Sequence, residues 1–414
     1  MNDASREFDV IVVGATGFTG ALVAEYLCDR YGIDGSLRWA AAGRSERKLS
    51  ALRQSLGPGA SALPLIVADT LDAGSMGELA RRTRVVLTTV GPYARYGSEL
   101  VAACARSGTH YCDLAGEVQW IRRMIDANDA TARNSGARIV HCCGFDSIPM
   151  DIGAWFLQQE ARERYGAHCD AIVLLVRAMK GGASGGTMAS MMNLMREARA
   201  DRAVARVLAR PYSLNPDGEQ RGPDRGDQRG VRFDDDAQSW TAPFIMASVN
   251  TRVVRRSHAL LGYPWGSDFR YREAIRTGRG LRGWLRAATV TAGLGGLVGL
   301  ASFAWSRSLL ERFVLPKPGT GPDREARENG FFELEQIGRL ADGRRITSRI
   351  RGDRDPGYGS TCKMLAESAV CLAHDELDCE GGVLTPAAAM AAPLLARLTE
   401  NAGLAFEILP SRSS

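Results

Sequence analysis

A short apolar run near the start of the chain gives way at once to a helical pattern. Residues 10–13 are Val-Ile-Val-Val, a β-branched run typical of a strand buried on both faces of a parallel sheet. The apolar positions 22, 23, 26 and 27 then follow the spacing of a helix. Glycines at 14, 17 and 20 separate the two patterns. A strand, a glycine turn and a helix in this order predict a dinucleotide-binding unit, whereas an ordinary strand–helix turn is the plainer alternative.

Each glycine has a physical task in such a unit. Gly14 allows a sharp turn, Gly17 lets the backbone approach a pyrophosphate, and Gly20 permits close packing of the helix on the strand. The free N–H groups at the start of the helix then face the phosphates. We therefore expect the cofactor to contact Gly14, Thr16, Gly17, Phe18, Thr19 and Gly20.

The same alternation of strand and helix continues to about residue 142. Further strands are predicted at 37–42, 63–69, 84–90, 110–114 and 137–142. Amphipathic helices are predicted at 98–106 and 118–134. Repeated βα units imply a parallel sheet with right-handed crossovers. The fold class is therefore α/β, with an N-terminal Rossmann-type, doubly wound parallel sheet.

The end of the second predicted strand carries positive charge. Arg44, Ser45 and Lys48 stand where an NAD site would place an acidic residue for the ribose hydroxyls. A guanidinium, a hydroxyl and an ammonium suit a 2′-phosphate, so the sequence favours NADP. Alternatively, these residues only decorate the solvated start of a helix.

Two more strand ends belong to the expected cofactor site. Asp69 follows the third strand, where its carboxylate accepts from the adenine amino group or caps the next helix. Val90, Gly91 and Pro92 follow the fourth strand and are placed to line the nicotinamide ribose, because ligands bind beyond the carboxyl ends of such strands.

Composition excludes several classes of protein. The 414 residues are 45% hydrophobic and 24% charged, as in a globular protein of more than one domain. A net charge of +5 is too weak to argue for nucleic acid. Nine scattered cysteines show no metal-ligand spacing, so we expect no metal and a reducing compartment. The first residues lack the apolar core of a secretory signal, and we expect a cytoplasmic protein.

Several motifs follow one another along the chain: Gly-Ala-Thr-Gly-Phe-Thr-Gly (14–20), Ala-Gly-Arg-Ser (42–45), Thr-Val-Gly-Pro-Tyr (89–93), Tyr-Cys-Asp-Leu-Ala-Gly-Glu (111–117), Cys-Gly-Phe-Asp-Ser-Ile-Pro-Met-Asp (143–151), Gly-Tyr-Gly-Ser-Thr-Cys-Lys-Met-Leu-Ala-Glu-Ser-Ala (357–369) and Gly-Gly-Val-Leu-Thr-Pro-Ala-Ala-Ala-Met (381–390). In these motifs the chain resembles the saccharopine dehydrogenase-like oxidoreductases. Within that family the chain is most similar to the mycobacterial trans-acting enoyl reductases. The resemblance implies NADPH-dependent reduction of a carbon–carbon double bond on a lipid precursor of the phthiocerol type, carried by a polyketide synthase partner. No arginine cluster suited to a dicarboxylate amino acid is evident, which argues against saccharopine as substrate.

The rest of the chain predicts a second, α+β domain over residues 151–375, with an antiparallel sheet that closes over the nicotinamide. Residues 1–150 form the NADP-binding domain, and residues 376–414 are expected to be a helical segment that packs back on it. Residues 211–236 are rich in Gly, Asp, Arg and Pro and predict a long mobile surface loop.

One apolar insertion stands out in the second domain. Residues 287–306 carry no charge and are preceded by arginines and by Trp284. Three interpretations stay open: a buried helical hairpin, a helix at a membrane surface, or a membrane span. We favour an apolar flap that meets a membrane or a lipid-like substrate, and so expect a peripheral membrane contact.

The reaction needs a proton donor beside the cofactor, since hydride transfer belongs to the nicotinamide. Candidates at the strand ends include Asp113, Glu117 and Asp146, and Tyr358 could face them from the second domain. Tyr93 is the first choice because it directly follows the fourth strand, although it could equally pack on the ring while solvent supplies the proton.

Three functions are compatible with these features. The first is an enoyl reductase acting on a carrier-bound or lipid-like substrate. The second is an amino-acid oxidoreductase of the saccharopine type. The third is a non-catalytic protein of a lipid surface that keeps the nucleotide fold as a scaffold, which the intact glycines and Arg44 disfavour. A homo-dimer is a further expectation.

Overall fold

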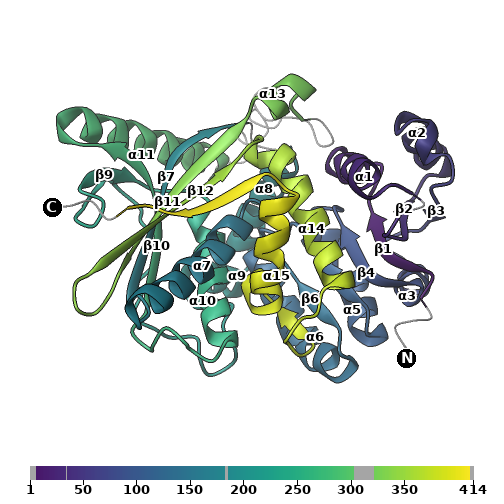
Figure 1. Ribbon diagram of the computed structural model, residues 1–414, viewed down its shortest axis with the longest axis horizontal. Coiled ribbons are helices and arrows are strands. Elements are labelled where there is room, and N and C mark those ends of the chain that lie inside the picture. Colours follow the sequence, from purple (N-terminus) through teal and green to yellow (C-terminus); the bar gives the residue numbers. More distant parts are fainter. Residues whose placement is uncertain (1–5, 34, 182–184, 303–320, 411–414) are drawn as a thin grey trace.

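The computed structural model describes residues 6–33, 35–181, 185–302 and 321–410. These residues form two seven-stranded sheets, one toward each end of the molecule (Figure 1). We call the sheet that contains the first strand sheet A and the other sheet B.

Sheet A is parallel throughout and confirms the predicted fold class. Its strands are β1 (Phe8–Val13), β2 (Trp39–Gly43), β3 (Leu65–Val67), β4 (Thr83–Thr88), β5 (His110–Cys112), β6 (Arg138–Val140) and β13 (Gly382–Leu384). The order across the sheet is β13-β6-β5-β4-β1-β2-β3, so the chain reverses its direction of travel between β1 and β4. A crevice at the carboxyl ends of these two strands is where such sheets bind ligands.

Helices cover both faces of sheet A, which explains why β1 is apolar at every position. Val10 and Val12 point into a core with α1 (Phe18–Tyr31), and Ile11 and Val13 point to the opposite core. The remaining helices around the sheet are α2 (Glu46–Ser55), α3 (Ala73–Arg82), α4 (Tyr93–Tyr96), α5 (Ser98–Ser107), α6 (Val118–Ser135) and the short turn η2 (Pro58–Ala60). A strand buried on both faces has no solvent side to make polar.

Sheet B is mixed, which corrects the expected antiparallel sheet. Its strands are β7 (Ala171–Lys180), β8 (Arg232–Asp234), β9 (Ser239–Ala242), β10 (Arg270–Gly278), β11 (Phe331–Arg339), β12 (Arg345–Gly352) and β14 (Leu404–Ile408). The order is β14-β12-β11-β7-β10-β9-β8, and β7 runs parallel to β10 while the other neighbours are antiparallel. The long crossover from β7 to β10 makes a parallel pair possible.

Helices cover one face of sheet B. They are α7 (Ile148–Tyr165), α10 (Ala247–Leu260) and α15 (Pro386–Glu400). On β11, Leu334 and Gln336 are buried toward this layer, whereas Glu335 makes ion pairs of 2.8 Å with Arg177 and Arg276. The alternation follows from the two-residue period of a strand, with one face against helices and the other charged.

The C-terminal part of the chain divides itself between the two sheets. The helix α14 (Thr361–His374) packs on α1 and on β1, β4 and β5, beside the nucleotide fold. β13 then completes sheet A beside β6, and β14 pairs with β12 at the edge of sheet B. Residues 376–408 therefore serve both domains rather than packing back on the first alone.

The segment 211–236 is more structured than the expected loop. Tyr212 and Leu214 are buried, and residues 232–234 form β8. Two carboxylates fix the segment to α10: Asp224 pairs with Arg255 at 2.8 Å and Asp227 with Arg252 at 2.9 Å. Residues 211–236 contain few apolar side chains, and buried ion pairs instead attach the segment to the domain.

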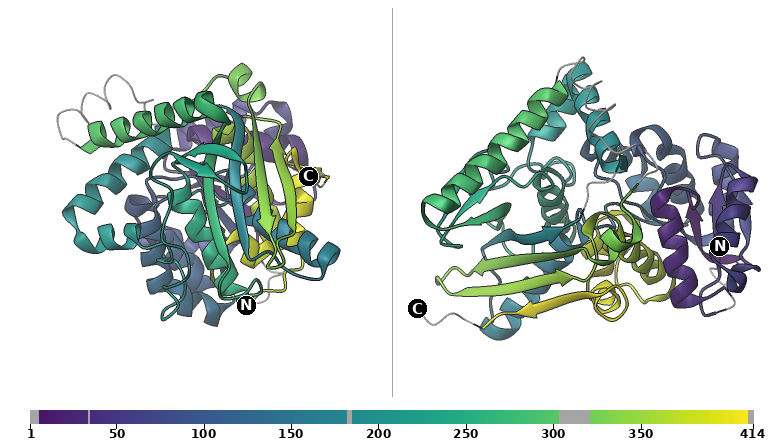
Figure 2. Two further views of the ribbon diagram at one scale, coloured as in Figure 1. Left: turned by 90° about the vertical axis from the view of Figure 1, so that its left-hand side faces the viewer. Right: turned by 90° about the horizontal axis from the view of Figure 1, so that it is seen from above.

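The apolar insertion begins as a single helix, α11 (Gly280–Ser302), which follows β10. Figure 2 shows it along the outside of the molecule, with α8 (Gly185–Ala200) against its far end. Most of its described side chains are exposed or half-buried, so this part is not the buried hairpin considered above. Among the described residues, no helix has both the length and the apolar character needed to cross a membrane. Residues 303–306 lie outside the described part.

Candidate active site

The glycine loop has the geometry expected of a pyrophosphate cradle. Gly14 has a φ of +83°, in the region that favours glycine, and a Cβ there would lie 2.6 Å from Cγ2 of Val90. A Cβ on Gly20 would collide with the carbonyl oxygen of Gly14, so the helix can approach the loop only through glycine. Gly17 is the N-cap of α1 and is exposed. The loop thus leaves its outer side open to an anion.

The start of α1 supplies donors for that anion. The first N–H groups of a helix have no intrahelical partner and carry the positive end of its dipole. Thr16, Phe18 and Thr19 are half-buried around this point, and the first turn of α1 has no acidic side chain to compete. The residues present therefore fit a dinucleotide phosphate.

The basic residues after β2 have unequal roles. Arg44 and Lys48 are exposed at the carboxyl end of that strand. The Ser45 hydroxyl caps α2 by accepting from the backbone N–H of Lys48 at 3.4 Å. Arg44 and Lys48 are thus open to a 2′-phosphate, while Ser45 also serves the helix.

Asp69 does not cap the following helix. Its carboxylate accepts from the N–H of Leu71 at 3.1 Å in a local turn, and Asp72 caps α3. The capping alternative for Asp69 is therefore wrong, and a contact with the adenine stays a prediction.

The turn after β4 lies directly beside the glycine loop. The N–H of Thr89 donates to the carbonyl of Val13 at 3.1 Å, and its hydroxyl donates to the carbonyl of Gly14 at 3.3 Å. Val90 and Pro92 are half-buried and Gly91 is exposed, at the point where the sheet reverses its strand order. These residues are placed where a nicotinamide ribose would lie.

Tyr93 packs in the interior, which corrects its choice as the proton donor. Its side chain is 5% exposed and stacks on Trp120 with centroids 5.5 Å apart. The hydroxyl donates to the carbonyl of Thr88 at 3.3 Å and accepts from the N–H of Leu114 at 3.1 Å. Burial raises the pKa of Tyr93 well above its ordinary value, so the hydroxyl is both engaged and reluctant to ionise.

Asp113 and Glu117 hold the backbone of the site instead of facing it. Asp113 is fully buried and accepts from His141 at 2.7 Å, the Tyr111 hydroxyl at 2.9 Å and two backbone N–H groups. Glu117 accepts from the N–H groups of residues 93 and 94 at 2.8 and 3.0 Å. Together they fix the loops that follow β4, β5 and β6.

Asp146 is the third carboxyl candidate, and its role as proton donor stays a prediction. It lies in the turn after β6, between the buried residues Phe145 and Ser147, and is itself half-buried. Burial raises the pKa of Asp146 to about 6. A carboxyl that keeps part of its proton near neutral pH, at the carboxyl edge of the sheet, suits a general acid.

The second half of the chain reaches the same edge through Tyr358. This residue lies in η3 (Pro356–Ser360), directly before α14. The hydroxyl of Thr361, the first residue of α14, accepts from the N–H of Phe145 at 3.1 Å, so the start of α14 contacts the loop that carries Asp146. The Tyr358 ring meets Phe18 edge-on with centroids 4.7 Å apart. This contact favours a role in holding the cofactor loop over proton donation.

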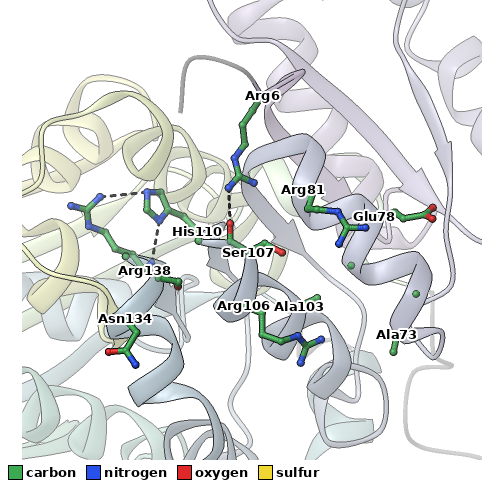
Figure 3. Close-up of a pocket in the computed structure, with 15 residues that line it drawn as sticks. Arg6, Ala73, Glu78, Arg81, Ala103, Arg106, Ser107, His110, Asn134 and Arg138 are labelled. Atoms are coloured by element: carbon green, nitrogen blue, oxygen red, sulfur yellow. Dashed lines mark hydrogen bonds between the residues drawn. The ribbon is translucent and has the colours of Figure 1, made fainter. Parts of the chain in front are cut away.

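A cavity of about 1060 Å³ lies at the opposite edge of sheet A (Figure 3). Its lining comes from Arg6, His110 and Arg138, which precede or begin strands, from α3 along residues 73–81, and from the carboxyl ends of α5 and α6. The Arg6 guanidinium donates hydrogen bonds to the backbone carbonyls of residues 80, 83 and 107. The cavity therefore faces the amino ends of the strands, away from the cofactor crevice.

Comparison with known proteins shows the family to which this chain belongs. The family model described as "Saccharopine dehydrogenase NADP binding domain" matches residues 10–140. A trans-acting enoyl reductase of Mycobacterium ulcerans (strain Agy99) is 42% identical, over 97% of this chain and 98% of that protein. A Mycobacterium tuberculosis (strain ATCC 25618 / H37Rv) protein whose name proposes the same activity is 44% identical, over 96% of this chain and 97% of its own.

A solved structure shows the same fold. Saccharopine dehydrogenase (L-Glu forming) from Saccharomyces cerevisiae matches with a TM-score of 0.56 and 12% sequence identity, covering 97% of this chain and all of that one. At this identity the likeness concerns the arrangement of the two sheets and not the substrate.

Proposed function

Because this chain belongs to the family of the mycobacterial trans-acting enoyl reductases and is an NADP-dependent oxidoreductase, we propose that it reduces the carbon–carbon double bond of a carrier-bound enoyl thioester. The observation that carries the proposal is a sequence identity of 42% and 44% to two proteins named for this activity, over nearly the whole chain. The half-buried Asp146 beside the cofactor crevice supports it.

The reaction divides between cofactor and protein. When bound, the reduced nicotinamide supplies the hydride, which adds to the β carbon of the enoyl group. The electron pair of the double bond then moves toward the thioester oxygen, and the α carbon takes a proton. We assign that proton to the carboxyl of Asp146, whose raised pKa lets it hold one near neutral pH.

An exposed apolar surface on the second domain supports a lipid-like substrate. On α11, Leu281, Trp284 and Leu285 are 71%, 41% and 50% exposed, and the helix carries no charge from residue 287 to its end. A water-facing helix ordinarily has a charged outer face. The exposed Arg282 and Arg286 flank this apolar surface, a combination typical of contact with an anionic lipid surface. We include in the proposal a peripheral membrane contact and a phthiocerol-type lipid product made with a polyketide synthase partner.

The first test is substrate-dependent oxidation of NADPH by the purified chain. An α,β-unsaturated acyl thioester is offered in one reaction, and saccharopine with NADP, or lysine with 2-oxoglutarate and NADPH, in parallel ones. Turnover with the thioester alone supports the proposal. Turnover with the amino acids alone would refute it and establish the second function considered from the sequence.

The lipid contact has its own test in vesicle sedimentation. The chain should sediment with vesicles containing phosphatidylglycerol, and Leu281→Ser with Leu285→Ser should reduce the bound fraction severalfold, because burial of each leucine contributes about 1.5–3 kcal/mol. Val67→Ser, an equally exposed apolar residue on β3, is the matched control. The contact is refuted if the parent, the double leucine variant and Val67→Ser sediment equally, or if none of them sediments.

Light scattering on the same purified proteins, without vesicles, tests the expected homo-dimer.

A further inference from the structure

The glycine motif lacks the charge that its ligand calls for. Residues 14–20 contain no lysine or arginine, and the first turn of α1 adds none. A dinucleotide pyrophosphate carries two negative charges, and the N–H groups with the helix dipole amount to about half a positive charge. A cation from elsewhere in the fold would complete the site.

The structure brings one such cation to the motif from the second half of the chain. Arg327 lies on the short helix α13 (Arg324–Glu328), and its Cζ atom is 5.6 Å from the centroid of the Phe18 ring. Phe18 is the first residue of α1, directly after the N-cap Gly17. The guanidinium therefore lies beside the anion-binding end of that helix.

Arg327 is held in place but keeps its charge available. Its guanidinium donates to the carbonyl of Pro322 at 2.7 Å, and its backbone carbonyl accepts from the N–H of Asp355 at 3.0 Å. The side chain is half-buried, and within the described residues no carboxylate lies at salt-bridge distance from it. Its charge does act on the buried carboxyl of Asp355, whose pKa is raised by burial and lowered by Arg327. Its neighbour Arg324, in contrast, is exposed and pairs with Glu328 at 2.9 Å.

Further contacts from the second half of the chain reach the same aromatic ring. The Tyr358 ring meets Phe18 from η3, and a Cβ on Gly321 would collide with the same ring. The aromatic ring of Phe18 is thus enclosed by three parts of the second half of the chain. A cofactor bound at α1 would have this cover on one side.

We propose that Arg327 is a cofactor-binding residue, which supplies positive charge to the pyrophosphate held at the amino end of α1. The proposal rests on the use of NADP and not on the identity of the reduced substrate. Charge at the pyrophosphate and charge at the 2′-phosphate would then come from opposite ends of the crevice, Arg327 at one and Arg44 at the other.

Equilibrium binding of nucleotides tests this without any turnover. We expect Arg327→Gln to weaken binding of NADPH and of ADP by about five- to tenfold, the size of one charge-assisted contact, and to leave 2′-AMP unaffected because it has no pyrophosphate. Arg44→Gln should do the reverse, weakening 2′-AMP and NADPH but not ADP. Arg324→Gln, on the same helix, is the matched control and should bind all three as the parent does.

A conservative variant separates charge from packing. Arg327→Lys should keep most of the affinity for NADPH, and the loss in Arg327→Gln should shrink as salt is raised. Wild-type affinity in Arg327→Gln would overturn the proposal, as would an equal loss in Arg324→Gln or an equal loss for 2′-AMP. If Arg327→Lys loses as much as Arg327→Gln, the side chain acts by packing on Phe18 and the assigned charge is wrong. None of these results depends on whether an enoyl thioester is reduced.

Discussion

Replacing Asp146 by asparagine should remove the pH dependence of the protonation step. With a pKa of about 6, about one molecule in ten carries the proton at pH 7, against about one in 1,600 at the ordinary value of 3.8. The raised pKa therefore increases the acidic form by about two orders of magnitude. In the parent enzyme the rate of enoyl reduction should fall as the pH rises through 6, about tenfold per unit.

The asparagine amide of Asp146→Asn is too weak an acid to donate a proton to the substrate. Its rate should be lower by about 10²–10⁴-fold and nearly flat between pH 5 and 8, with solvent as the remaining donor. NADPH oxidation is followed with saturating thioester over this range, and NADPH affinity is measured separately to show that the cofactor site is intact.

Asp151 provides a control that titrates at the same pH. Burial raises its pKa to about 6 as well, but its carboxylate is bonded to Ser257 and to the N–H of Ala387 in the interior. In Asp151→Asn the rate of enoyl reduction should still fall as the pH rises through 6. If this fall disappears in Asp151→Asn and persists in Asp146→Asn, the assignment of Asp146 as the acid is wrong.

The same raised pKa has a consequence for stability. A carboxyl whose pKa is higher in the folded chain than in the unfolded chain favours folding while it is protonated. Its contribution is complete below about pH 4 and is lost as the pH rises through 6. Asp146→Asn should therefore unfold with a weaker dependence on pH in this window, which thermal denaturation at several pH values measures.

Three further variants test the description of the site. Gly20→Ala should destabilise the fold by about 1–3 kcal/mol and abolish tight NADPH binding, because its Cβ would collide with the Gly14 carbonyl. Gly59 lies in open space, so Gly59→Ala should change neither the stability measured by thermal denaturation nor the affinity for NADPH. Tyr93→Phe should keep the rate within about twofold but lower stability by about 1–3 kcal/mol, since the N–H of Leu114 loses its acceptor; a large loss of rate with unchanged stability would restore the acid role. Arg44→Ser should weaken NADPH at least tenfold and leave NADH unchanged, and equal losses for both would reject the 2′-phosphate contact.

Local patterns made the nucleotide fold predictable from the sequence. Each strand of sheet A that precedes residue 142 contains at least two consecutive apolar residues, and the glycine spacing placed the first helix correctly. The hairpin of β11 and β12 also has a local basis, because apolar and polar residues alternate along both strands on either side of the turn at Asp342-Gly343. These features depend on neighbours within a few residues.

Features that depend on distant parts of the chain could not be predicted in this way. The parallel pairing of β7 with β10 joins segments about 100 residues apart, and β13 is a three-residue strand with no pattern of its own. The burial of Tyr93 follows from Trp120 and Leu114, which no spacing rule connects to it. Arg327 lies more than 300 residues from Phe18, so only the fold shows that they meet.

Because the C-terminal segment contributes strands to both sheets, the two domains cannot be separated by cutting the chain at one position. Sheet A gains its last strand from residues 382–384 and its covering helix from residues 361–374, and sheet B gains an edge from residues 404–408. A chain that stops at residue 150 would leave β6 with an open edge and one face of β4 and β5 bare, an invitation to aggregation. The nucleotide fold therefore closes only near the end of synthesis, and it cannot be cut out at residue 150 and grafted onto another enzyme as a ready-made cofactor module.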